Sequence, residues 1–114
     1  MSPKVWPVQA TQLDTSTAKK YGNIQKPMCS VTEYPTGEDG DAYQRKLAIA
    51  GEILHASLEF NPDTDFLLLV GDPILIGLAM SAVGNVAKDA GVENVSVLRY
   101  DKKLGRYLEI VVEL

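Results

Sequence analysis

A short, uninterrupted apolar segment is the feature that most limits the folds open to this chain. Residues 66–70 (FLLLV) include no polar side chain, and a strand that is apolar on both faces is normally buried at the centre of a sheet between layers of helix. Gly71, Asp72 and Pro73 follow at once, and a segment of helix length runs on to Gly91. Asp72 is a favourable N-cap, proline is favoured at the first helical position, and glycine is favoured just past a helix end. The segment therefore predicts a strand, a tight turn and a helix.

Two alternating segments close the chain. Residues 94–100 and 106–112 alternate apolar and polar side chains, and the loop DKKLG (residues 101–105) joins them with a glycine at its end, which is typical of a β-hairpin. Two strands joined through a helix are parallel, and their connection is right-handed. The last strand follows a tight hairpin loop, so it adds antiparallel to the strand before it. We predict an α/β fold: a single domain (residues 1–114) with a mixed β-sheet, a central strand–helix–strand unit, a C-terminal β-hairpin, and helices packed on the sheet.

The first third of the chain is less regular. Residues 5–10 predict a short strand, and Pro7 within it lacks an N–H donor, which suits a sheet edge. Residues 14–22 predict a short helical segment that ends at Gly22 in the left-handed region. Residues 23–31 predict a further strand, broken by a proline.

A second helix is expected from Asp41, as its N-cap, to about residue 60, where Asn61 and Pro62 stop it. Its apolar side chains recur at helical spacing and form one stripe. The stripe consists of Tyr43, Leu47, Ala50, Leu54 and Leu58.

Composition excludes several classes of protein. The net charge of -4 and the pI near 4.9 argue against a non-specific DNA-binding protein, which needs a basic surface. One cysteine, Cys29, and one histidine, His55, leave too few ligands for a typical zinc site. Loop carboxylates such as Asp63 and Asp65 are expected to be solvated. No apolar run is long enough to span a membrane. We expect no metal, no cofactor and no membrane contact, and a cytoplasmic location.

The turn at Gly71 and Asp72 is a candidate ligand site. It lies at the carboxyl end of a central strand and at a helix N-terminus, where open α/β sheets bind ligands. Neither the G-x-G-x-x-G nor the G-x-x-x-x-G-K-[ST] nucleotide motif is present, however. The alternative is that Asp72 is a plain N-cap. We expect no catalytic residues.

The hairpin is a candidate partner-binding site because it gathers cations and aromatic rings within nine residues. Arginine and tyrosine are enriched in protein interfaces, the same residue types bind single-stranded nucleic acid, and a hairpin tip is also commonly polar for solubility alone. These three readings stay open. The candidate residues are Arg99, Tyr100, Lys102, Lys103, Arg106 and Tyr107.

The helix after Asp72 carries a stripe of small residues, Gly77, Ser81 and Gly84. Glycine costs about 1 kcal/mol relative to alanine inside a helix, so the stripe indicates a close backbone approach. We expect the sheet below to be the partner. The alternative is another helix, in a homodimer or a host protein.

Three segments together suggest a family: VQATQLDTSTAKKYGNI (residues 8–24), NPDTDFLLLVGDPILIGLAM (residues 61–80) and LRYDKKLGRYLEIVVEL (residues 98–114). They resemble small uncharacterised proteins of tailed bacteriophages, chiefly short-tailed phages of the T7 group. The resemblance covers about half of the chain. It implies a phage product made in a bacterial cytoplasm, and transfers no activity and no site residue.

The leading hypothesis is a non-enzymatic phage interaction protein that binds and modulates a host or phage macromolecule, with a host or phage protein as the first expectation for its partner. One alternative is a small-ligand or nucleotide-binding domain that uses the turn at Gly71 and Asp72. Further alternatives are nucleic-acid binding through the hairpin and a role in virion assembly.

Overall fold

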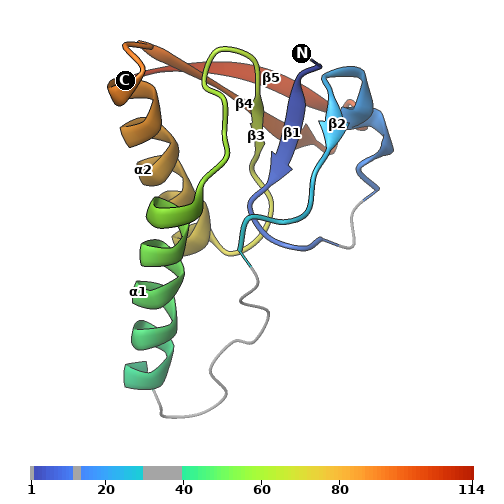
Figure 1. Cartoon of the computed structure of the whole chain (residues 1–114). Coiled ribbons are helices and arrows are strands. Elements are labelled where there is room, and N and C mark those ends of the chain that lie inside the picture. The colour runs from blue at the N-terminus through green and yellow to red at the C-terminus, as the bar shows by residue number, and fades with distance from the viewer. Residues whose placement is uncertain (1, 12–13, 30–39) are drawn as a thin grey trace.

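The computed structural model describes residues 2–11, 14–29 and 40–114. It contains a twisted five-stranded sheet, two α-helices and one short 3-10 helix (Figure 1). In chain order the elements are β1 (Lys4–Pro7), η1 (Ser16–Lys20), β2 (Asn23–Ile24), α1 (Gly40–Ser57), β3 (Phe66–Leu68), α2 (Pro73–Asp89), β4 (Asn94–Asp101) and β5 (Arg106–Glu113).

The sheet has the strand order β2-β1-β3-β4-β5. The first four strands are parallel, and β5 runs antiparallel to β4. The predicted α/β fold with a mixed sheet and a C-terminal hairpin is therefore confirmed. After β1 the chain continues to β2 on one side of the sheet, and after β3 it continues to β4 on the other side. The strand order therefore reverses between β1 and β3. This reversal is the place where doubly wound sheets hold their ligands.

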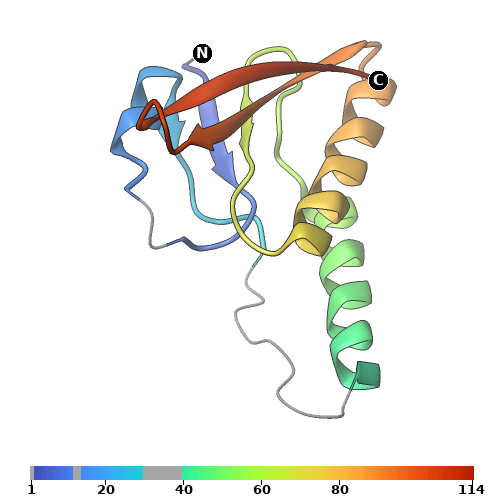
Figure 2. The ribbon, with the colours of Figure 1, turned by 180° about the vertical axis from the view of Figure 1, so that it is seen from behind.

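Helical segments cover both faces of the sheet. α1 and α2 lie together on one face, and η1 packs on the other (Figure 2). The adjacent residues Leu67 and Leu68 of β3 point to opposite faces, and both are fully buried. Each belongs to a different hydrophobic cluster, one under the α-helices and one under η1. The prediction that residues 66–70 contain a central strand buried on both faces is confirmed.

The helix predicted from Asp41 is present, with three residues of its apolar stripe, Leu47, Ala50 and Leu54, buried. It begins at Gly40, so Asp41 lies in the first turn and is not the N-cap. It ends at Ser57, before the predicted stop. The chain leaves the helix there because Phe60, 4% exposed, turns into the core.

The prediction of an edge position for Pro7 is wrong. β1 lies between β2 and β3, yet β2 pairs only with Lys4 and Val5 of β1. Val8 N donates to Leu68 O on the β3 side, so the neighbouring Pro7 nitrogen points to the β2 side, past the end of that short strand. An interior strand thus tolerates proline because its neighbour stops first.

Two other expectations for this region need correction. The strand predicted for residues 23–31 is reduced to Asn23–Ile24 and a single bridge from Cys29 to Gln9, and residues 30–31 lie outside the described residues. The predicted helical segment is η1, but Gly22 after it has no positive φ. Glycine is required at this position because a Cβ would overlap the carbonyl of Pro3.

Two of the three small residues on α2 do not pack on the sheet, so the prediction is wrong for them; Gly84 is half-buried, and a Cβ there would lie 3.8 Å from the side chain of Leu114, just past β5. Gly77 and Ser81 are exposed, and a Cβ at Gly77 would meet no described atom within 4 Å. The helix instead packs by a face that carries mostly alanine, while the larger Ile74 is 52% exposed. The buried residues of α2 are Leu75, Ala79, Ala82, Val83 and Ala87.

Candidate functional site

The turn at Gly71 and Asp72 lies where the strand order reverses, beside Gln9 at the carboxyl end of β1. The backbone N–H of Asp72 donates to Oε1 of the buried Gln9 at 2.9 Å. Oδ1 of Asp72 accepts the N–H of Ile74 at 2.8 Å, and Oδ2 accepts the hydroxyl of Tyr43 at 3.1 Å. Both carboxylate oxygens are thus engaged within the protein.

These contacts confirm Asp72 as the N-cap of α2 and show that it also links α2 to other elements. Through Tyr43 it ties α1 to the start of α2, and through Gln9 its backbone is tied to β1. The turn has the position of a ligand site, but its polar groups hold the fold together. Gln9 and Tyr43 were not identified as part of this turn from the sequence, since only the fold brings them next to Asp72.

The β4–β5 hairpin extends beyond the rest of the sheet. β3 pairs with β4 only as far as Leu98, whereas the hairpin continues to the pair Asp101 and Arg106 (Figure 2). Leu104 at the tip is 56% exposed. Four predicted site residues are also exposed on this extension: Arg99, Lys102, Lys103 and Arg106.

Internal contacts hold the tip in one conformation. Oδ1 of Asp101 accepts the N–H of Leu104 at 3.0 Å, and Gly105 takes a positive φ of 63°. The rings of Tyr100 and Tyr107 pack with their centroids 5.2 Å apart.

Tyr107 differs from the other hairpin candidates because its side chain is fully buried. Its hydroxyl donates to the carbonyl of Asp14, and its own carbonyl accepts the hydroxyl of Tyr21 at 3.3 Å. The side chain therefore anchors the hairpin to the segment around η1 and is not presented to a partner. Tyr100, which it packs against, is half-buried.

Burial also raises the pKa of Tyr107 above its ordinary value near 10, and Tyr100 and Asp14 add to the shift. The unfolded chain ionises this group first as pH rises. The stability linked to Tyr107 is thus fully present below pH 10 and is lost above it. We expect a pH titration of tyrosinate absorbance to show one late-ionising tyrosine, which Tyr107→Phe removes. An unchanged titration curve for that variant would contradict this assignment.

Two further cations lie beside the hairpin. η1 packs against β5, and its Lys19 and Lys20 are exposed. Lys20 places its Nζ 5.0 Å from the ring centre of Tyr21, which contacts Tyr107. The short helix η1 therefore adds two exposed cations beside β5. Sequence reasoning missed these lysines because they are about eighty residues from the hairpin in the chain.

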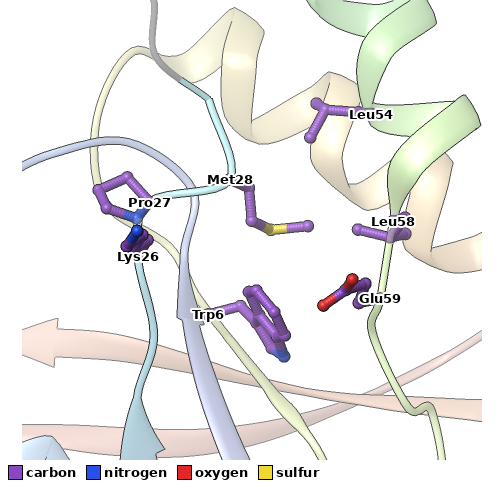
Figure 3. Close-up of a pocket in the computed structure, with 7 residues that line it drawn as sticks. All are labelled: Trp6, Lys26, Pro27, Met28, Leu54, Leu58 and Glu59. Atoms are coloured by element: carbon purple, nitrogen blue, oxygen red, sulfur yellow. The ribbon is translucent and has the colours of Figure 1, made fainter.

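A shallow hollow of about 160 Å³ lies on the helix-covered face of the sheet (Figure 3). Trp6 forms its floor, Met28 reaches in from one wall, and the end of α1 supplies the other. The lining combines apolar side chains with the charged Lys26 and Glu59. Its residues come from three separate segments, which is why no sequence pattern predicted it. The lining residues are Trp6, Lys26, Pro27, Met28, Leu54, Leu58 and Glu59.

Within residues 2–11, 14–29 and 40–114, no three side chains of histidine, cysteine, aspartate or glutamate are grouped to hold a metal ion. No helix in the same part of the chain is long and apolar enough to cross a membrane.

These features define a small doubly wound α/β domain whose edge hairpin carries a basic tip. The model of the Phage Pam3 gp32-like protein family matches residues 3–114. The chain belongs to that family, which confirms the resemblance to a phage protein family and extends it over nearly the whole chain. No curated protein and no solved structure matches it.

Proposed function

We propose that this phage protein is a non-enzymatic interaction protein that binds an acidic surface of a host or phage protein through the tip of its hairpin. The observation that carries the proposal is the concentration of exposed cations on that tip, in a chain whose net charge is -4. Complementary charge of this kind speeds association and selects the partner.

The rigidity of the tip supports this proposal. Asp101 and Gly105 fix the turn, and the buried Tyr107 anchors the strands. A surface that is already ordered loses less conformational entropy on binding. The exposed Leu104 adds an apolar contact at the centre of the cations.

Two of the alternatives, nucleic-acid binding and a small-ligand site, have less support. Single-stranded nucleic acid is bound largely by stacking bases on exposed aromatic rings, whereas Tyr107 is buried and Tyr100 packs against it. A small ligand at the turn would have to displace contacts that Asp72 already makes with Ile74 and Tyr43.

The test uses the tagged full chain to capture partners from a lysate of infected host cells, followed by affinity measurement on the purified partner. In the test variant, Arg99, Lys102 and Lys103 are changed to glutamine. We expect its affinity to fall at least about tenfold, because the complementary charges are lost. Binding by the wild type should also weaken as salt rises.

The matched control changes Lys26, Arg45 and Lys88 to glutamine. These three cations are exposed on other parts of the molecule, and the net charge changes by the same amount. Equal loss of affinity in both variants would refute the hairpin as the binding site. If the purified protein instead binds a labelled single-stranded oligonucleotide and the partner competes for it, nucleic-acid binding replaces this proposal.

A further inference from the structure

The outer side of β5 is a free strand edge within the described part of the chain. β5 is the last strand of the sheet and runs along the outside of β4 (Figure 2). The N–H of Leu114 donates to Glu93 O at 2.9 Å, so the even-numbered residues of this strand bond inward to β4. The N–H and C=O groups of the odd-numbered residues, from Tyr107 to Glu113, therefore point outward.

One end of this edge is already occupied. The hydroxyl of Tyr21 donates to the outward carbonyl of Tyr107. The open edge thus runs over residues 108–114. An open apolar edge of this length is a ready template for another strand.

Two exposed apolar side chains lie side by side on this strand. Ile110 is 42% exposed and Val111 is 57% exposed. As consecutive strand residues they project from opposite faces of the sheet. A partner docked on one face would cover only one of them, whereas a strand added along the edge flanks both.

We propose that β5 pairs antiparallel with β5 of a second copy of this chain, so that two five-stranded sheets join into one continuous sheet. Such a two-fold contact requires a surface that is complementary to itself. The apolar row Leu108, Ile110 and Val112 meets this condition, because it is symmetric about Ile110.

The positions of the glutamates select the register, which is set by the residue on which the two-fold pairing of β5 with its copy is centred. A two-fold pair centred on Glu109 sets that carboxylate against its own copy, and one centred on Val111 sets Glu109 against Glu113 of the second copy. Like charges directly opposite each other destabilise a strand pair. Centring on Ile110 instead places Glu109 against Val111 and Leu108 against Val112. A register centred on Val112 leaves Glu109 and all earlier residues of β5 unpaired.

Salt should strengthen this association. Glu109 and Glu113 lie on the same face of β5, so pairing brings four carboxylates into one region, and added salt screens their repulsion. Binding of an acidic partner by the hairpin has the opposite dependence, so the two proposals fail independently.

Sedimentation equilibrium of the full chain tests the dimer. We expect a concentration-dependent monomer–dimer equilibrium, and Ile110→Lys should lower the association constant at least about tenfold by setting two cations against each other. The matched control is Ile49→Lys on α1, where the isoleucine is 56% exposed, and its constant should stay within about twofold of wild type. A wild-type chain that is monomeric up to about 1 mM, or equal loss in both variants, overturns the proposal.

Cysteine cross-linking tests the register. The natural Cys29 is buried, so an introduced thiol is the one that reacts. Opposite residues in the central pair have Cβ atoms about 5 Å apart, close to disulfide geometry. We expect Ile110→Cys to form a disulfide-linked dimer faster than Glu109→Cys or Val111→Cys. Faster linkage in either of those variants overturns the register.

Discussion

Replacement of Asp65 by alanine is expected to lower the free energy of unfolding by about 4 kcal/mol. The carboxylate is 3% exposed and accepts four hydrogen bonds. Oδ1 accepts from the N–H of Lys4 at 3.1 Å and the hydroxyl of Thr64 at 3.2 Å. Oδ2 accepts from the indole of Trp6 at 3.0 Å and the N–H of Asn61 at 2.9 Å. Alanine leaves these donors without their acceptor, and each buried donor without a partner costs about 1–3 kcal/mol.

Urea denaturation of the full chain measures this effect, and the same loop supplies the control. Asp63 is exposed, so Asp63→Ala should change stability by no more than about 0.5 kcal/mol. Asp65→Asn keeps one acceptor oxygen and should fall between the two. Equal stability of the two alanine variants would show that Asp65 is solvated in solution.

Asp65 also shows where sequence reasoning ends. Its neighbours in the chain are polar loop residues, and the expectation of a solvated carboxylate was wrong because Lys4 and Trp6 are about sixty residues away. The central unit was predicted correctly because its signals are local: the apolar run of β3, the cap at Asp72, and the positive φ of Gly91. Local signals of this kind carry most of what a single sequence reveals.

The candidate sites show the same contrast between local features, which the sequence predicts, and contacts between distant residues, which it does not. The exposed cations of the hairpin were found from the sequence, because a hairpin tip is defined by its own residues. The burial of Tyr107 was not, since it depends on packing against Tyr21 and Asp14. The orientation of the small-residue stripe on α2 was also missed. A helix presents several faces, and the face of α2 that packs on the sheet carries mostly alanine, another set of small side chains.

The turn at Gly71 leaves no room for a side chain. The residue takes a φ of 109°, which L residues rarely adopt, and a Cβ there would overlap the side chain of Gln9. Gln9 is not free to move away, because its Oε1 holds the N–H of Asp72, and Asp72 in turn caps α2. A larger residue at this position strains the backbone and opens the contact between β1 and α2 together.

We therefore expect Gly71→Ala to destabilise the protein by about 3 kcal/mol, from a backbone strain of about 1–3 kcal/mol and the loss of the partly buried hydrogen bond to Gln9. Gly77→Ala is the matched control, because Gly77 is exposed on α2 with open space around it. Alanine there should stabilise the helix by about 0.5–1 kcal/mol. The same substitution, glycine to alanine, is thus expected to lower the thermal midpoint at Gly71 and to raise it at Gly77. An unchanged or raised midpoint for Gly71→Ala would mean that the turn can relax, and that Gln9 does not hold it.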